Sequence, residues 1–198
     1  MRKLLLTCIV IVASIFQASA QCLMYPVLLS QRVPQSSFII EGKVINQQCF
    51  WNTNHDKIYT SNLIEVYKTF KNTVSPYIEI ITEGGIVGMS KHVFEPTLEL
   101  EIGQVGVFTL NTNNQPSQFG KQVYEAYASA QGFIKYDIAS DLASEPFNNY
   151  QNASTSLYNT ITQLTGTSYN QIKPINPFQQ TAPNVNTIQN VAAITSFT

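Results

Sequence analysis

Two segments rich in Ile, Val, Phe and Tyr flank a polar loop in residues 38–71, and this run constrains the fold more than any other part of the chain. β-Branched and aromatic residues favour strands, whereas Asn and Asp favour the turn between them. Further strand-like segments follow at residues 77–82, 98–102, 105–110, 123–127 and 133–136. Short strands at such spacing predict a mainly β domain, either a sandwich or a small barrel.

Alternation within these segments predicts which side chains face solvent. In residues 98–102 apolar and acidic residues alternate, which places Glu99 and Glu101 on one face of a strand. Glu79 is likewise assigned to an exposed strand face. Residues 105–110 carry no charge, which predicts a buried strand. Residues 123–127 and 133–136 are expected to form a pair around Gly132, and a helical turn is an equal alternative for residues 123–127.

The first 20 residues have the pattern of a secretory signal: Arg2 and Lys3, then an apolar stretch over residues 4–16, then a small-residue exit ending at Ala20. The apolar stretch is shorter than the roughly 20 residues that span a bilayer. The sequence therefore predicts cleavage near Ala20 and a secreted, extracellular chain that leaves the membrane.

The net charge of the chain argues against a nucleic-acid partner. Without Arg2 and Lys3 the 11 basic side chains fall to 9, against 12 acidic ones, a net charge near −3. Nucleic-acid binding needs a basic face that displaces counterions from phosphate, so no nucleic-acid partner is expected.

Cysteine usage predicts one disulfide. Cys8 leaves with the signal, and the mature chain keeps Cys22 and Cys49. An even pair in an exported chain favours a bridge, which would stabilise the fold by about 3 to 4 kcal/mol on the chain-entropy model. Metal binding or a nucleophilic thiol is the alternative, but the nearby sequence offers no partner for either.

No sequence motif indicates catalysis. The two histidines, His55 and His92, have no metal-ligand spacing and are expected at the surface. Gly84 and Gly85 predict a turn, because the lysine and helix of a phosphate loop are missing. We therefore expect a protein that is not an enzyme, with no catalytic residue, no metal and no cofactor.

A binding role has one set of candidate residues, Phe50 and Trp51 beside Asn52 and His55. Large aromatic residues on a polar loop can stack on a sugar or anchor a protein contact. Alternatively, the same rings pack against the end of the barrel and have only a structural role.

The composition changes after Glu145, since Lys173 is the only charged side chain in residues 146–198. An apolar stripe predicts one helix that docks on the barrel and stops at Gly166; it comprises Tyr150, Ala153, Leu157, Ile161 and Leu164. The following Pro- and Asn-rich stretch is typical of a linker.

Four segments in sequence order after Cys22 resemble the netrin-like module: FIIEGKVI, IYTSNLIEVYKTFK, IEIITEGGIVG and LELEIGQVGVFTL. That module is an OB-type β-barrel shared by the tissue inhibitors of metalloproteinases. QGFIKYD and the ending VAAITSFT are similar to the start of secreted multidomain proteins of Bacteroidetes-type bacteria. Some of those proteins continue into immunoglobulin-like IPT domains and a matrixin-type zinc protease.

The sequence patterns and the resemblance together predict the domain organisation. It runs as a signal over residues 1–20, an OB barrel over 21–141, a docked helical segment over 142–172, a linker over 173–190 and the start of a following domain over 191–198. The resemblance also implies a binding or regulatory module at the N-terminus of a larger exported protein. The expected partner is protein, namely a neighbouring domain of the same polypeptide, and a glycan is the alternative. Metalloprotease inhibition is less well supported, because Gln21 before Cys22 removes the free cysteine amine that such inhibitors place on the zinc.

Overall fold

The computed structural model describes residues 24–179; the predicted signal, Cys22 and residues 180–198 lie outside this range. The strands are β1 (Phe38–Trp51), β2 (Ile58–Lys71), β3 (Tyr77–Glu83), β4 (Gly85–Val87), β5 (Ser90–His92), β6 (Val105–Thr112), β7 (Val123–Ala126), β8 (Phe133–Asp137), β9 (Leu142–Glu145), β10 (Asn148–Gln151) and β11 (Asn170–Gln171). The helical elements are α2 (Leu29–Gln35), η1 (Ser129–Gly132), the π-helical turn η2 (Ala153–Leu157), α3 (Tyr158–Thr165) and η3 (Pro177–Gln179). No helix in this range is long and apolar enough to span a bilayer.

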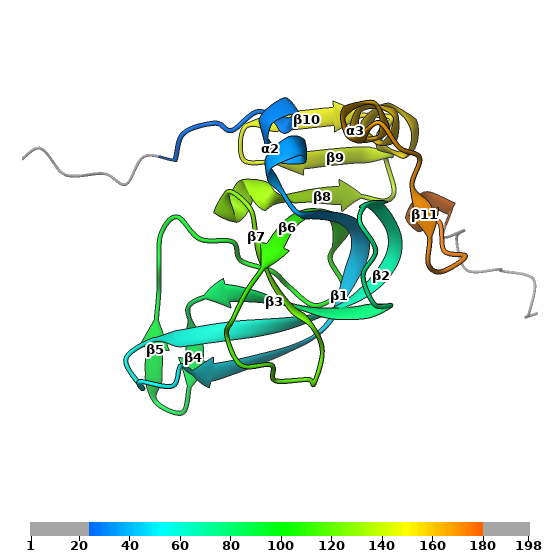
Figure 1. The fold of residues 1–198 in the computed structure, drawn as a ribbon. Coiled ribbons are helices and arrows are strands. Elements are labelled where there is room, and N and C mark those ends of the chain that lie inside the picture. The colour runs from blue at the N-terminus through cyan, green and yellow to red at the C-terminus, as the bar shows by residue number, and fades with distance from the viewer. Residues whose placement is uncertain (1–23, 180–198) are drawn as a thin grey trace, which may run out of the picture.

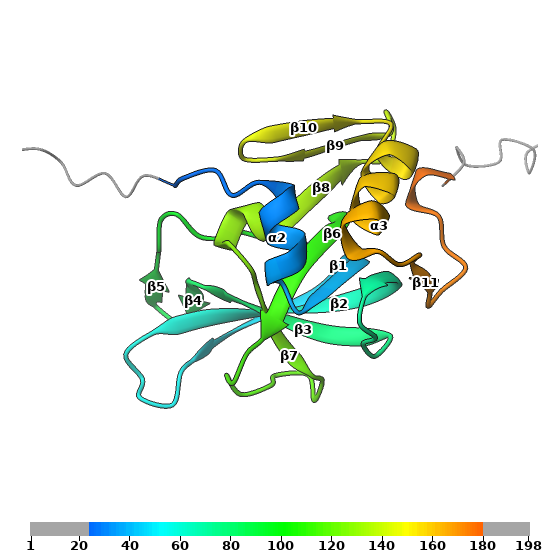
Figure 2. The ribbon, with the colours of Figure 1, turned by 45° about the horizontal axis from the view of Figure 1, so that its top comes forward.

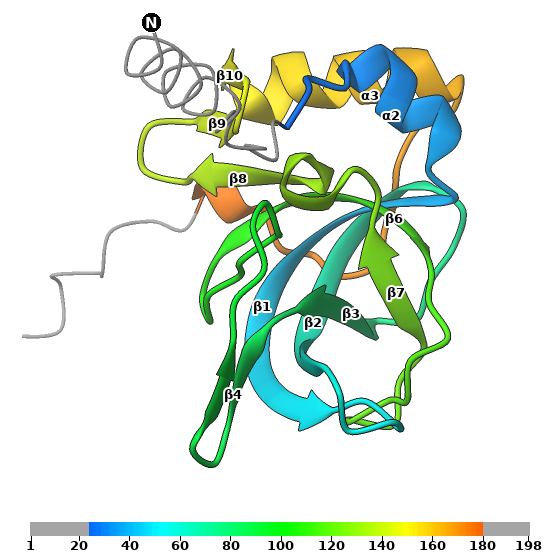
Figure 3. The same ribbon diagram turned by 90° about the vertical axis from the view of Figure 1, so that its left-hand side faces the viewer.

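Five strands close into a barrel (Figure 3). β1, β2 and β3 form an antiparallel meander, β6 pairs antiparallel with both β1 and β7, and β7 pairs parallel with β3. The ring order β1-β2-β3-β7-β6 is that of an OB-type barrel, and a closed ring leaves few strand edges unpaired. The predicted mainly β fold with a small barrel is therefore confirmed.

Alternate side chains of the ring fill the barrel interior. This first core is built from Ile40, Val44, Ile64, Val66, Ile78, Ile80, Phe108, Leu110, Tyr124 and Phe133, with Leu98 and Leu100 entering from a connecting segment. Residues 105–110 are buried as predicted, because β6 contributes to this core from one face and to a second core from the other.

The second core lies on the outer surface of the barrel. β8, β9 and β10 extend the sheet from β6, and α2 and α3 lie beside this extension (Figures 1 and 2). Ile39 of β1 and Val107 of β6 point outward into this core, where they meet Leu157 and Ile161 of the C-terminal helices. β1 thus has apolar residues on both faces because layers cover it on both sides.

A buried polar network joins the barrel to α3. The Glu41 carboxylate is fully buried and pairs with the Lys68 ammonium, while the hydroxyls of Tyr136 and Tyr158 donate to it. Burial, and then the nearby Glu41 charge, raises the pKa of both phenols above the ordinary value of 10.0. Both hydroxyls therefore remain donors at neutral pH, and the network fixes α3 in one position.

A second buried ion pair holds the N-terminal segment. The Arg32 guanidinium, on α2, pairs with the Glu145 carboxylate and donates to the Gln131 carbonyl. The Gln131 side chain in turn donates to the Tyr25 carbonyl at 2.9 Å and accepts from the Val27 amide at 2.7 Å. Residues 25–27 are thus fixed against η1.

Three strand predictions differ from the structure. Residues 98–102 form no strand, although Glu99 and Glu101 are exposed and Leu98 is buried as the alternation predicted. Glu79 is not exposed but fully buried, because the β6–β7 loop folds over it. β7 and β8 do not pair with each other; each pairs with a different part of β6, since the chain turns through η1 between them.

The C-terminal part contains more strand than the composition indicated. Residues 142–151 form the β9–β10 hairpin, and the helix begins only at Ala153. Ala153, Leu157 and Ile161 are buried as the stripe predicted, and Gly166 ends α3 in a left-handed conformation with φ of 70°.

The beginning of the predicted linker is packed on the barrel. β11 pairs with the part of β2 that extends beyond β3, and the Ile172 amide donates to the Tyr67 carbonyl at 2.8 Å. The Lys173 ammonium pairs with the Glu65 carboxylate, and the Phe178 ring lies 4.6 Å from that of Tyr136. Residues 170–178 therefore form a strap, while the rest of the linker and the predicted following domain lie outside the described residues.

Candidate functional site

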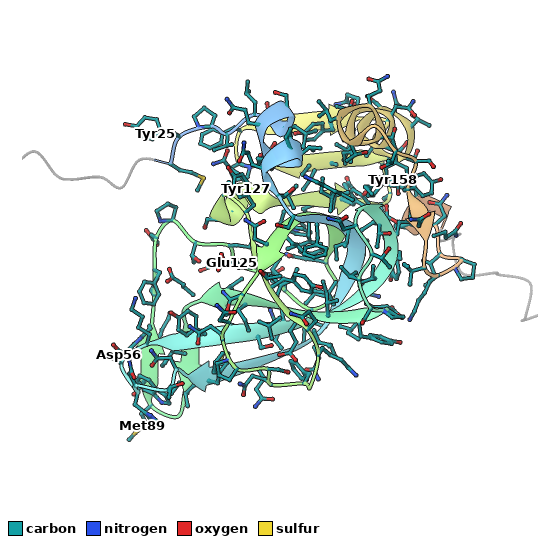
Figure 4. The ribbon with its side chains drawn as sticks, viewed as in Figure 1. Tyr25, Asp56, Met89, Glu125, Tyr127 and Tyr158 are labelled. Carbon is teal, nitrogen blue, oxygen red and sulfur yellow. The ribbon has the colours of Figure 1, made fainter. Side chains whose placement is uncertain are left out.

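Two hairpins project together from one end of the barrel. The β1–β2 hairpin continues its ladder as far as the pair Trp51 and Ile58, and β4 packs beside it. Gly85 makes this packing possible, because a Cβ there would lie 2.7 Å from the Cys49 sulfur. Figure 4 shows Asp56 and Met89, one from each hairpin, at this end of the molecule and far from Tyr158. We call it the hairpin end.

A groove of about 590 Å³ runs along the hairpin end. One wall is β5 with the residues after it, and the other is residues 97–101; Cys49 and Thr60 also line it. We call this the hairpin groove. Its charged lining residues are Glu83, Glu99, Glu101 and Lys91, so the groove carries a net charge of −2 with histidine neutral. None of the three carboxylates forms an ion pair within residues 24–179.

A second groove adjoins the first at Thr82, Glu83, Thr97 and Leu98. Its volume is about 420 Å³, and its lining includes Tyr59 of β2 and residues 113 and 115 of the β6–β7 loop. We call it the barrel-edge groove. Its charged side chains are Glu83 and Glu125, so both grooves are acidic.

The β6–β7 loop owes its position to Glu79. The carboxylate accepts hydrogen bonds from the hydroxyls of Ser61 and Ser117 and from the backbone amides of Gln118, Phe119 and Lys121. Burial alone would raise the pKa of Glu79, but these hydrogen bonds outweigh burial and lower it below the ordinary value of 4.5. Glu79 is therefore ionised at neutral pH and holds one wall of the barrel-edge groove.

The predicted aromatic pair lies on strand β1, not on a loop, and its two rings have different surroundings. Phe50 is only 8% exposed; it stacks on Tyr59 at 6.0 Å and packs with Ile81 and Val123. This is the structural role that the sequence left open as an alternative. Trp51, the next residue, is half-buried on the opposite face of β1.

Trp51 is held between two histidines. The His55 ring stacks on it at 6.3 Å with an interplanar angle of 16°, and the His92 ring meets it edge-on at 5.2 Å. His92 Nδ1 accepts a hydrogen bond from the Ile58 amide at 3.2 Å, which places the proton of a neutral ring on Nε2. The sequence had assigned His92 to the surface, but its ring joins the β4–β5 hairpin to the end of β2.

Asn52 and His55 form the turn between β1 and β2. The Asn52 side-chain oxygen accepts from the amides of Asp56 and Lys57 at 3.1 and 3.2 Å, and its amide group donates to the Asp56 carboxylate at 2.6 Å. His55 is exposed with φ of 56°, a left-handed turn conformation. The contacts of Asn52 are those of a turn residue.

The hairpin end exposes three large apolar side chains that the sequence did not single out. Ile86 is 57% exposed, Met89 is 106% exposed and Val93 is 58% exposed. We call them the hairpin surface. β4 and β5 have only three residues each, too few to bury these side chains on the barrel. The signal in the sequence was the presence of apolar residues on both sides of Gly88, in a short segment that begins at Gly85.

The Cys49 sulfur is half-buried in the hairpin groove, 3.3 Å from the Thr60 hydroxyl. Its predicted partner, Cys22, lies outside the described residues, so the disulfide stays a prediction. Among residues 24–179 no group of three or more His, Cys, Asp or Glu side chains has the arrangement to hold a metal ion.

The hairpin end thus combines two adjoining acidic grooves, an exposed apolar hairpin and one half-buried tryptophan. Its polar groups are placed to fix turns and loops, as Asn52 and Glu79 illustrate. No protein-family model, curated protein or solved structure matches the chain.

Proposed function

We propose that this chain is a secreted, non-catalytic module that binds another protein through the hairpin end. The observation that carries the proposal is the hairpin surface, where Ile86, Met89 and Val93 expose more than half of each side chain on one short hairpin. Apolar side chains gathered in this way, with polar residues around them, are typical of protein interfaces. The neighbouring Trp51 and Phe94 extend the apolar area that a partner would bury.

The netrin-like resemblance supports the same reading, because the strand order is that of an OB-type barrel. The fold alone does not assign an activity, so our choice of partner is based on the sequence resemblance. We propose a neighbouring domain of the same exported polypeptide as the partner, which this module would position or restrain. If that domain is a metalloprotease, the module regulates it.

Site-specific photo-crosslinking tests the proposal in the exported protein produced from its whole gene. A photoreactive phenylalanine analogue replaces Met89, and the matched control carries it in place of Ile138, which is 41% exposed in the β8–β9 turn. We expect a discrete crosslink from position 89 that peptide mapping assigns to one protein segment. The substitutions Ile86→Ser and Val93→Ser should abolish that crosslink. Equal crosslinking from both positions, or none from position 89, would refute the proposal.

A glycan-binding function is the second candidate. The barrel-edge groove favours it, because OB-type barrels bind oligosaccharides on the face of their second and third strands, and Tyr59 and Ile81 lie there. The aromatic residue proposed to stack on a sugar has less support, since His55 already covers one face of Trp51. A glycan array decides: sugar retention that disappears in a folded Tyr59→Ala variant would favour a glycan in the barrel-edge groove, and retention that disappears only in a folded Trp51→Ala variant would favour stacking on the tryptophan. No binding by the native module would exclude the glycan.

A further inference from the structure

Residues 98–101 alternate between buried and exposed positions, as in an extended segment, and the backbone of residues 97–99 has no partner among the described residues. Their amides and carbonyls make no hydrogen bond to any other residue between 24 and 179, and no strand pairs with them. An extended segment with unpaired backbone groups is a template for an added strand. In this chain, residues 97–99 line the hairpin groove.

The segment is fixed at both ends. On its N-terminal side the Pro96 carbonyl accepts from the Ser129 hydroxyl at 3.3 Å. On its C-terminal side the chain rejoins β1, since Gly103 donates to Val44 at 2.8 Å and the Val44 amide donates to Gln104 at 2.9 Å. In between, Leu98 and Leu100 are anchored in the barrel interior. Because the fold already holds residues 97–101 in place, binding of a strand would not carry the entropic cost of ordering them.

The opposite wall offers a second backbone edge. β5 pairs with β4 through one edge, as in the pair of Ile86 with Lys91, and in the two-stranded sheet its other edge has no strand partner among the described residues. The hairpin groove lies between this wall and residues 97–101. Two segments whose backbone edges have no strand partner in this part of the chain thus line the groove, together with residues 82–86.

The charge of the hairpin groove indicates which side chains an added strand would carry. Glu99 and Glu101 are exposed on the same face of residues 97–101, with Glu83 nearby, and Lys91 is the single cation of the lining. Opposite charges on directly facing residues of neighbouring strands are stabilising, whereas like charges are destabilising. The other face of an added strand would point toward Cys49 and Thr60, where small or apolar side chains fit.

We infer that the hairpin groove binds an extended peptide segment of a partner protein by strand addition along residues 97–99, with cationic side chains alternating with small or apolar ones. The inference rests on the proposed protein-binding function and specifies its mode. Residues 180–198 of this chain are a poor occupant, because they contain no charged side chain that would complement the carboxylates.

The test uses a fluorescein-labelled peptide, acetyl-Lys-Val-Lys-Thr-Lys-Val-Lys-amide, and fluorescence polarisation with the folded chain. In an extended peptide the amides of alternate residues point to the same edge. N-methylation of the amides of the last three lysines therefore blocks one edge, and N-methylation of the three Val and Thr amides blocks the other, with the same number of methyl groups and the same charge in both peptides. We expect one of these two isomers to lose binding and the other to retain it.

Protein variants and hydrogen exchange locate the contact. Glu99→Gln and Glu101→Gln should each weaken binding by about 1.5- to 5-fold, the range of exposed charge pairs, whereas Glu125→Gln in the other groove should leave it unchanged. Amides of residues 97–99 should exchange more slowly when the peptide is bound.

Three results would overturn the inference. Equal binding of the two N-methylated isomers would show electrostatic adsorption without strand addition. Absence of peptide binding would remove the inference but leave the crosslink from position 89 as an independent test of the proposed function. The amides of residues 97–99 could also be protected from hydrogen exchange in the isolated chain and lose that protection when residues 180–198 are deleted. This result would assign the groove to the chain's own tail.

Discussion

Replacement of Glu79 by Gln is expected to destabilise the fold by about 2 to 4 kcal/mol at neutral pH. The fully buried carboxylate accepts three backbone amides and two hydroxyls, and the amide distances are 2.7 Å from Gln118 and 3.0 Å from Phe119 and Lys121. A glutamine keeps one acceptor oxygen and places an NH₂ group where the other oxygen stood.

The magnitude follows from the donors that lose their acceptor. In the better orientation the NH₂ group faces the Ser61 hydroxyl, which can rotate, and the Gln118 amide, which cannot. One orphaned buried amide costs about 1 to 3 kcal/mol, and the remaining bonds lose their charge assistance. In the other orientation two backbone amides are orphaned, so the cost is larger.

Urea denaturation at several pH values measures this effect. The pKa of Glu79 is lowered in the folded state, so its contribution is complete above the unfolded value of 4.5 and is lost as the pH falls through the lowered folded pKa. The difference in unfolding free energy between the native chain and the Glu79→Gln variant should therefore shrink in acid. Glu125→Gln, an exposed change on the neighbouring strand β7, is the control and should stay within about 0.5 kcal/mol. A Glu79→Gln variant as stable as the native chain at neutral pH, or a difference that does not change with pH, would refute the reasoning.

Three further predictions concern other parts of the fold. Non-reducing peptide mapping of the exported chain should join Cys22 to Cys49, and an alkylated Cys49 would contradict the bridge. Glu41→Gln should destabilise the fold by about 3 to 5 kcal/mol because it leaves the buried Lys68 ammonium unpaired, and adding Lys68→Met should recover part of that loss in a double-mutant cycle; additive losses would contradict the pairing. Gly106→Ala should cost about 1 to 3 kcal/mol in chemical denaturation, because its Cβ would lie 2.1 Å from a carbonyl of β8; a neutral substitution would show that β6 and β8 do not approach this closely.

Local patterns predicted which segments are extended and which of their side chains are buried. The uncharged residues 105–110 became β6, and the alternation in residues 98–101 placed Leu98 inside and Glu99 outside. The same alternation did not reveal that, within residues 24–179, this segment forms no backbone hydrogen bonds with a neighbouring strand. Pairing depends on which strands the turns bring together, and a period of two is the same with or without a partner.

The candidate site was predicted only in part. Phe50 and Trp51 were expected on a loop, but the ladder of β1 with β2 extends through both, so their side chains point to opposite faces. His92 and Met89 were missed because they reach the hairpin end through β4 and β5, far along the chain from Trp51. Contacts between residues so distant in sequence leave no local signal.

The sequence by itself determined the mainly β class, the helix that Gly166 ends and the acidic charge that the grooves display, because each depends on composition or on short-range periodicity. Only the tertiary structure decided the burial of Glu41 and Glu79, the second core outside the barrel and the unpaired backbone of residues 97–99. A carboxylate on a strand has the same local sequence whether it faces water or a loop that supplies amides. Long-range packing decides whether the carboxylate faces water or such a loop.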